Sequence, residues 1–169
     1  MMNNDQAIKR LAVSGMLTAL AVALSGFSIP IGASRCFPAQ HLVNVIAGVF
    51  LGPVYGTGIA FCTSLARNIM GTGSLLAFPG SMVGAFLCGI LFRKTGKLAA
   101  AYAGEMAGTG ILGGLLCYPV AAWIMGKEVA LFFYVIPFLM STVCGTVIAA
   151  VLIGIMKQSG AFYRLKELL

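Results

Sequence analysis

The only histidine of the chain, His41, stands three residues before Asn44 and seven before Gly48. On a helix these positions share one face, which is polar and open. A lone histidine gives no metal-ligand spacing, and an intramembrane metalloprotease needs two histidines and an acid on one helix face. We therefore expect this face to bind a solute, and capping of a helix by His41 is the structural alternative.

Other sequence patterns that carry out chemistry are missing. No serine stands in a G-x-S-x-G elbow, and the single aspartate, Asp5, excludes the aspartate cluster of a CDP-alcohol phosphotransferase. The phosphate-binding loop G-x-x-x-x-G-K-[ST] is also missing. We therefore expect no enzyme activity, no cofactor and no ATP hydrolysis by this chain. An intramembrane enzyme that relies on His41 is the weakest alternative.

Further polar and aromatic side chains interrupt the apolar sequence. Polar groups at membrane depth are costly, so they usually line a cavity or pair with one another. Aromatic rings offer flat surfaces to a heteroaromatic ring or a cation. We predict that such groups converge with His41 and Asn44 on a pocket for a small, partly aromatic solute. The further candidates are Arg35, Ser64, Arg67, Asn68, Ser74, Glu105, Tyr118, Trp123, Tyr134 and Ser141.

Each of these groups also has a purely structural interpretation. Arg35 and Arg67 are long enough to extend to lipid headgroups. Trp123 and Tyr134 are typical of membrane-interface anchors. Glu105 is able to form a structural pair with an arginine. Only the expected clustering on one side of the membrane favours the pocket.

Composition excludes a water-soluble globule. Of 169 residues, 60% are hydrophobic and 9% are charged, and the mean hydropathy is +1.00. Soluble domains carry roughly 25% charged residues. The net charge of +7 comes from bases that stand between apolar runs, which favours orientation in an anionic bilayer over nucleic-acid binding. We expect an all-α integral membrane protein with one transmembrane domain, residues 1–169.

Apolar runs predict six transmembrane helices, at about 8–29, 41–51, 54–68, 79–92, 98–124 and 129–156. We take the first run as a retained span, although its basic start resembles a secretory signal. The segment 41–68 is ambiguous, because Gly52-Pro53 either kinks one helix or separates two short ones.

Positive charge favours six helices with both termini in the cytoplasm. Eight basic residues then lie on the cytoplasmic side and three lie outside, whereas five helices give at best seven against four. The first helix carries Gly15, Ala19 and Ala23 at four-residue spacing, a stripe that lets another helix approach closely. Packing within the bundle is the alternative use of this stripe.

These features in this order resemble the substrate-binding (S) components of energy-coupling factor (ECF) vitamin transporters. The matching elements are the basic N-terminus, the Ala19-x-x-x-Ala23 stripe, the loop after the first helix and the turn in "VIAGVFLGPVYGTGIA". More specifically, "PIGASRCFPAQHLVNVIAGVFLGPVYG" and "SLARNIMGTGSLLAFPGSMVGAFLCG" look like the ThiW family. That family is assigned to uptake of the thiazole precursor of thiamine, hydroxyethylthiazole.

The resemblance implies a subunit in the plasma membrane of a prokaryote. It would capture the solute from outside, while a transmembrane coupling protein and two cytoplasmic ATPase subunits drive release. Gly15, Ala19 and Ala23 would dock on the coupling protein. The solute would sit under the loop after the first helix, enclosed by segments 79–92, 98–124 and 129–156.

Within the ThiW-like stretches, the main expected binding residues are Arg35, His41, Asn44, Arg67 and Asn68. Two arginines and a histidine argue against a cationic solute. If both arginines point inward, a phosphorylated or carboxylated solute becomes attractive. Alternative functions are an S component for another vitamin or heteroaromatic solute, and a small self-associating membrane channel.

Overall fold

The computed structural model describes residues 4–31 and 34–169, and nearly all of this chain is helical. The N-terminal part comprises α1 (Asn4–Ala23), a 3₁₀ helix η1 (Leu24–Gly26), strands β1 (Ile29–Ile31) and β2 (Ser34–Cys36), α2 (Pro38–Phe50) and α3 (Pro53–Ile69). The C-terminal part comprises α4 (Ala77–Thr95), α5 (Leu98–Glu105), η2 (Met106–Gly113), α6 (Gly114–Pro119), η3 (Val120–Ile124), α7 (Val135–Gln158) and α8 (Ala161–Leu168). The segments α5 to η3 form one continuous helix, in which η2 and η3 are π-helical.

α2 and α3 are two helices rather than one kinked helix. Gly52 has a φ of 87°, a left-handed backbone conformation that favours glycine, and Pro53 begins α3. α2 likewise begins with a proline, Pro38, three residues before the expected start at position 41. The two helices are 13 and 17 residues long. Most of α2 is buried in the bundle.

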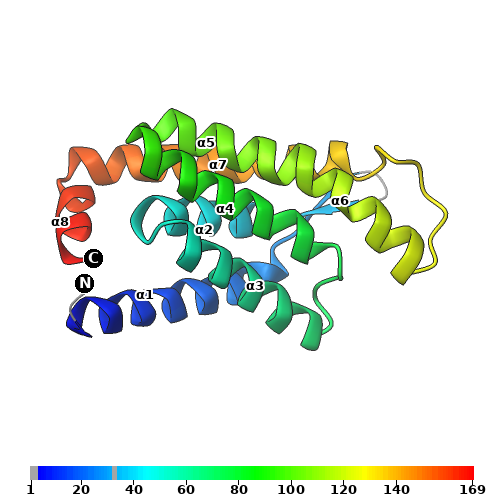
Figure 1. The fold of residues 1–169 in the computed structure, drawn as a ribbon, viewed down its shortest axis with the longest axis horizontal. Helices are drawn as coiled ribbons and strands as arrows, with labels where there is room; N and C mark the ends of the chain where they lie inside the picture. The colour runs from blue at the N-terminus through cyan, green and yellow to red at the C-terminus, as the bar shows by residue number, and fades with distance from the viewer. Residues whose placement is uncertain (1–3, 32–33) are drawn as a thin grey trace.

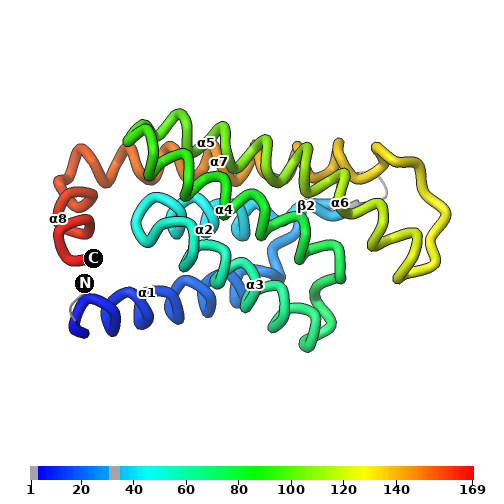
Figure 2. Tube along the Cα trace, in the orientation of Figure 1, coloured from blue at the N-terminus to red at the C-terminus, as the bar shows by residue number. Residues whose placement is uncertain are grey.

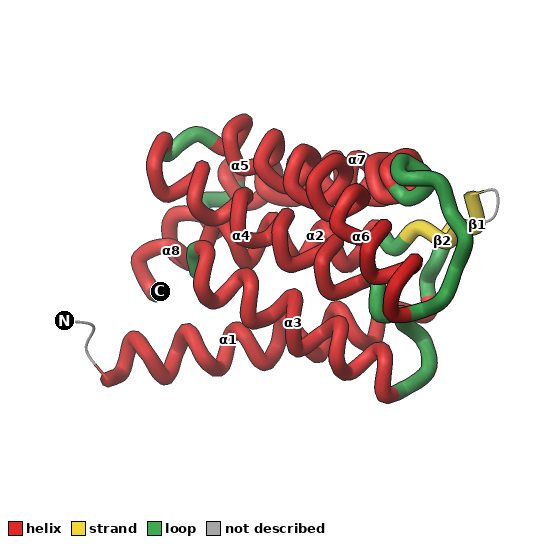
Figure 3. Tube along the Cα trace, turned by 45° about the vertical axis from the view of Figure 1, so that its right-hand side comes forward, coloured by secondary structure: helices red, strands yellow, loops and turns green. Residues whose placement is uncertain are grey.

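The helices lie side by side in an elongated bundle (Figure 1). α4 runs through its middle and contacts α2, α3, α5 and η2, while α1 packs mainly against α3. α1 begins and α8 ends at the same end of the bundle, where Arg10 Nε donates to the Leu169 carbonyl at 2.6 Å (Figure 2). The β1–β2 hairpin lies at the opposite end, beside the loop that precedes α7 (Figure 3).

Glycines allow α4 to lie directly against η2. A Cβ on Gly84 would overlap Thr109 Oγ1 and lie 2.8 Å from Glu105 Oε2. A Cβ on Gly108 would lie 2.7 Å from the Gly84 Cα. Small residues that permit such close approach are typical of helix contacts inside membranes.

Three helical segments are long and apolar enough to cross a membrane by length and composition: 4–26, 98–124 and 135–158. Much of the apolar surface is exposed, as at Trp123 and Ile69, and only Ala21 of α1 is buried. Many exposed large apolar side chains are expected of a chain surrounded by lipid. The chain is therefore a membrane protein.

Several boundaries differ from the sequence-based expectation. The first helix ends at Gly26 rather than 29, because the chain turns into the β1–β2 hairpin. The last long helix begins at Val135 rather than 129, after a left-handed Gly126 and a turn at 131–134. Beyond the last predicted span the chain forms a further short helix, α8, whose Phe162 packs against Phe50 at a ring-centroid distance of 5.1 Å.

Candidate solute-binding cavity

A cavity of about 510 Å³ lies at the end of the bundle opposite the termini. Small-molecule sites commonly measure about 300–1,000 Å³. The residues that line it come from η1 and the hairpin region, the start of α2, the α3–α4 connection and the start of α7. They are Ser25, Gly26, Ser28, Arg35, Phe37, Gln40, His41, Arg67, Gly71, Thr72, Gly73, Ser74, Leu76, Ala77, Ser81, Tyr134, Pro137, Phe138 and Ser141.

The segment after the hairpin is fixed to α7. The Phe37 backbone N–H donates to Ser141 Oγ at 2.8 Å, and Cys36 Sγ donates to the Pro137 carbonyl at 3.5 Å. Burial raises the pKa of the Cys36 thiol, so it stays a neutral donor. These contacts hold one side of the cavity wall in place.

Tyr134 contributes a hydroxyl group to the same side. The residue is 6% exposed and immediately precedes α7. Burial raises the pKa of its phenol, so the hydroxyl remains protonated at neutral pH. It is thus available to the cavity as a donor as well as an acceptor.

Arg67, near the end of α3, is only 3% exposed. Its Nη1 donates to Gln40 Oε1 at 2.5 Å, and its Nη2 donates to the Thr72 carbonyl at 3.3 Å. The guanidinium carbon lies 4.0 Å from the centroid of the Phe37 ring. These contacts aim a cation at the cavity from the wall opposite α7.

The neighbouring Asn68 fixes the α3–α4 connection. Its Nδ2 donates to the Ser64 carbonyl at 2.8 Å and to the Ser74 carbonyl at 3.0 Å. Ser64 Oγ in turn lies 3.2 Å from Ser81 Oγ on α4. Asn68 and Ser64 therefore shape the wall of the cavity from behind.

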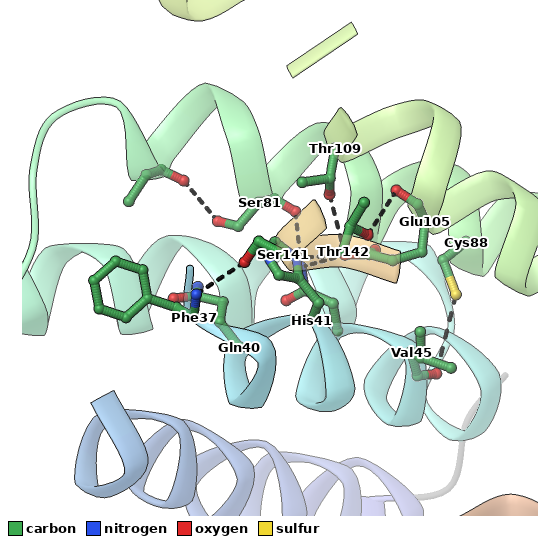
Figure 4. A network of polar contacts seen from close by, with 12 residues as sticks. Phe37, Gln40, His41, Val45, Ser81, Cys88, Glu105, Thr109, Ser141 and Thr142 are labelled. Carbon is green, nitrogen blue, oxygen red and sulfur yellow. Dashed lines mark hydrogen bonds and ion pairs between the residues drawn. The ribbon is translucent and has the colours of Figure 1, made fainter. Parts of the chain in front are cut away.

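Glu105 is the centre of a buried polar network (Figure 4). Its Oε1 lies 2.9 Å from His41 Nδ1, and it accepts from Asn44 Nδ2 at 3.1 Å and Thr109 Oγ1 at 3.0 Å. Thr142 Oγ1 donates to the Glu105 backbone carbonyl at 3.4 Å. Side chains of α2 and the long helix thus meet at one fully buried carboxyl group, and α7 contacts the backbone carbonyl of the same residue.

This network orients the ring of His41. A carboxylate beside Nδ1 favours the tautomer that carries its proton on Nδ1, as in histidines held by a carboxylate in metal sites. In that tautomer the lone pair is on Nε2, and this ring is part of the cavity wall. His41 therefore offers an acceptor where Tyr134 and Arg67 offer donors.

The structure brings together half of the residues predicted from sequence. Arg35, His41, Arg67, Ser74, Tyr134 and Ser141 line the cavity. Asn44, Ser64, Asn68 and Glu105 lie behind its wall and hold lining residues in place.

Tyr118 and Trp123 do not line the cavity, in contrast to the prediction. Trp123 is 83% exposed, and Tyr118 lines a separate shallow depression with Lys127 and Glu128. Both stand in the last turns of the long helix, beyond the part that packs closely on α4 and α7. Figure 1 shows this end of the helix projecting from the bundle.

Sequence reasoning missed several lining residues. Phe37 and Gln40 stand in a ThiW-like stretch but were not selected as candidates, and Gln40 contacts Arg67 across 27 positions. Ser25 and Ser28 were expected inside a helix. Pro38 was an available signal for the true start of this helix, because proline is common at the first helical position. A start at Pro38 would have placed Gln40 in the first turn.

The small-residue stripe of α1 faces away from the bundle. Gly15, Ala19 and Ala23 are all exposed, and a Cβ on Gly15 would meet nothing within 4 Å. Among the described residues the stripe does not serve internal packing.

A family model described as "Thiamine-precursor transporter protein (ThiW)" matches residues 11–159 of the chain. No curated protein matches it.

Proposed function

Because the chain belongs to the ThiW family of thiamine-precursor transporter proteins, we propose that it is the substrate-binding S component of an ECF transporter. Its solute is a thiazole of the hydroxyethylthiazole class. The observation that carries this proposal is the mixed polar and aromatic cavity at one end of the bundle, lined by His41, Arg67, Tyr134 and Ser141. Other proteins supply the energy for transport.

The chemistry of the cavity suits a heteroaromatic ring with polar substituents. Phe37, Leu76 and Phe138 offer apolar contact to a flat ring. His41 offers an acceptor for a hydroxyl group, and Ser141 and Tyr134 offer hydroxyl groups to a ring nitrogen or oxygen. A few polar groups in an otherwise apolar cleft are the usual arrangement for a small-molecule site. Another heteroaromatic solute with the same pattern is the alternative.

The distribution of charge supports an orientation with this cavity outside. The bases Lys9, Arg10, Arg93, Lys94, Lys97, Lys157, Arg164 and Lys166 belong to the end of the bundle that holds the termini and the α4–α5 turn. Arg35, Arg67 and Lys127 belong to the other end. Because cytoplasmic segments carry the excess of Lys and Arg, both termini lie in the cytoplasm in this proposal.

The exposed stripe Gly15, Ala19 and Ala23 is the surface we assign to a transmembrane coupling protein. Small side chains let a partner helix approach α1 closely. Two ATPase subunits complete the proposed transporter, since this sequence has no phosphate-binding loop. A channel is less well supported, because the cavity wall is backed by the buried network around Glu105 rather than by a continuous polar path.

Titration calorimetry tests the function directly. The purified chain in lipid nanodiscs, without ATP or partners, is expected to bind hydroxyethylthiazole or a close derivative saturably. His41→Ala should weaken binding about tenfold, the loss of one buried polar contact worth about 1.4 kcal/mol. Trp123→Ala is the matched control and should change the Kd less than about twofold, because Trp123 is exposed outside the cavity.

Absence of saturable binding for every thiazole tested would reject the thiazole proposal. Flux of ions or solute through liposomes that contain this chain alone would favour the channel instead.

A further inference from the structure

Arg67 is a buried cation without an anionic partner. It is 3% exposed, and both of its hydrogen bonds go to neutral acceptors, the Gln40 amide and the Thr72 carbonyl. Across residues 4–31 and 34–169, the one contact within 4.0 Å between a basic and an acidic side chain joins His41 and Glu105, so Arg67 has no carboxylate partner there. A buried charge is costly, and in membrane proteins it is almost always paired or turned toward a water-filled cavity.

Gln40 adds further unused donors beside this cation. Arginine only donates, so Gln40 must turn its Oε1 toward Arg67 and its Nε2 away. Nε2 of Gln40 and Nε of Arg67 are both buried without a hydrogen-bond partner. Both side chains line the cavity. Gln40 and Arg67 therefore have N–H donors for which the protein supplies no acceptor.

No carboxylate lines the cavity to balance this charge. The chain has four acidic residues, and none of them is part of the wall. Glu105 lies behind His41, where its Oε1 is engaged by three side chains and its Oε2 is buried without a hydrogen-bond partner. Arg35 also lines the cavity, together with hydroxyl groups of Ser25 and Thr72. The cavity wall therefore carries two arginines and no carboxylate.

We propose that the solute which fills this cavity is an anion, and that its phosphate or carboxylate oxygens bind Arg67 and Gln40. The thiazole part of the inference rests on the proposed function. The ring then lies against Phe37 and Phe138, and the anionic group reaches the α3–α4 connection. Planar guanidinium groups are well suited to oxyanions because they donate two parallel hydrogen bonds. A neutral alcohol would bring no negative charge to the buried guanidinium group of Arg67.

The first experiment compares three ligands by calorimetry on the full chain in nanodiscs. They are hydroxyethylthiazole, its phosphate monoester and the corresponding carboxylic acid. We expect at least one of the two anions to bind about tenfold more tightly than the neutral alcohol. Arg67→Gln should reduce this ratio to near one, and Arg67→Lys should restore part of it.

The ratio of the affinity for the anions to the affinity for the neutral alcohol distinguishes direct recognition by Arg67 from an effect of Arg67 on folding. An Arg67 role limited to holding Gln40 and the loop would weaken all three ligands equally. Arg93→Gln removes an exposed arginine at the other end of the bundle and should leave the ratio unchanged. Binding of the neutral alcohol by Arg67→Gln reports that this variant is folded.

A second experiment needs no thiazole. Sodium phosphate, compared with sodium chloride at equal ionic strength, should raise the apparent melting temperature of the wild-type chain and of Arg93→Gln. It should have no such effect on Arg67→Gln.

Each outcome decides between the two claims. If the thiazoles fail to bind but phosphate stabilises the chain through Arg67, the thiazole function is wrong and the anion site stands. If the neutral alcohol binds as tightly as both anions, and Arg67→Gln weakens all three equally, the anion inference is wrong and the thiazole function stands. If no ligand and no salt shows a dependence on Arg67, the anion inference is also wrong.

Discussion

Glu105 contributes to the cavity without touching it. It is 0% exposed, whereas the other three acidic residues are exposed. Donors from His41, Asn44 and Thr109 meet at its Oε1, so one carboxyl group fixes two side chains of α2 and one of the long helix. Because His41 Nδ1 lies 2.9 Å from this oxygen, Glu105 fixes how the ring of His41 faces the cavity, while Glu105 Oε2 is buried without a hydrogen-bond partner.

Replacing this carboxylate with an amide should weaken binding without unfolding the chain. Glu105→Gln keeps the shape and one acceptor oxygen but removes the charge that favours the proton on His41 Nδ1. We expect about tenfold weaker binding of the preferred thiazole and a small loss of thermal stability. Calorimetry and a thermal melt of the same sample measure both.

Glu128→Gln serves as the control for that substitution, since Glu128 is exposed on the loop before α7. It should leave both quantities unchanged. Wild-type affinity in Glu105→Gln would show that the network has no part in recognition.

Six of the candidates chosen by residue type and spacing line the cavity. His41 and Asn44 share a face of α2 as expected, because three residues are close to one helical turn. The contacts of Arg67 with Gln40 and Phe37 were not predictable, since they join α3 to the first turn of α2 and depend on the packing of both. Tyr118 and Trp123 were predicted to line the pocket only because they are aromatic. Residue type does not indicate where a long helix extends beyond the bundle.

At the scale of elements, the contact of α4 with the long helix positions the network. Gly84 leaves the space that Thr109 and the second carboxyl oxygen of Glu105 occupy. The π-helical segment η2 begins directly after Glu105, at this contact. π-Helical turns are frequent at functional sites.

Gly84→Ala should therefore damage the site through packing. The added methyl group would overlap Thr109 Oγ1 and push α4 away from η2. Overpacking of this kind costs about 1–3 kcal/mol, so we expect a lower apparent melting temperature and weaker solute binding. Thermal melts in a mild detergent, followed by binding measurements, check this result.

The matched variant is Gly58→Ala on α3, where a Cβ meets nothing within 4 Å. Alanine favours a helix over glycine by about 1 kcal/mol, so this variant should be as stable as the wild type or slightly more so. Equal melting temperatures for Gly84→Ala and the wild type would contradict the close packing of α4 and η2.

Element boundaries were predictable where local chemistry determines them. Gly52-Pro53 separates α2 from α3, and the long apolar run gives a helix over 98–124. The β1–β2 hairpin was not predictable, because each strand has only three residues and its position depends on contacts with α7. α8 was not predicted, because its sequence is rich in charge, yet its Phe162 and the following Leu169 are buried against the bundle.

At the scale of the whole molecule, the two ends of the bundle differ in charge and in shape. One end holds the chain termini and most of the basic residues, and the other holds the hairpin and the cavity. This polarity suits a chain that receives a solute on one side of a membrane and meets cytoplasmic partners on the other.

Cysteine accessibility in intact cells tests this orientation. Lys127→Cys lies on the loop before α7 and should react with a membrane-impermeant maleimide added outside. Lys97→Cys lies in the turn between α4 and α5 and should react only after the cells are permeabilised. The reverse pattern would place the cavity on the cytoplasmic side and contradict the proposed direction of uptake.

The most direct test of the central claim is protection of the cavity from alkylation by the solute. Ser74→Cys places a thiol on the cavity wall, while the native Cys62 is exposed elsewhere on α3 and provides an internal reference. We predict that a thiazole ligand slows alkylation of the cysteine at position 74, with half of the effect at its calorimetric Kd, and leaves the rate at Cys62 unchanged. An unchanged rate at position 74 under saturating ligand would show that the solute binds elsewhere.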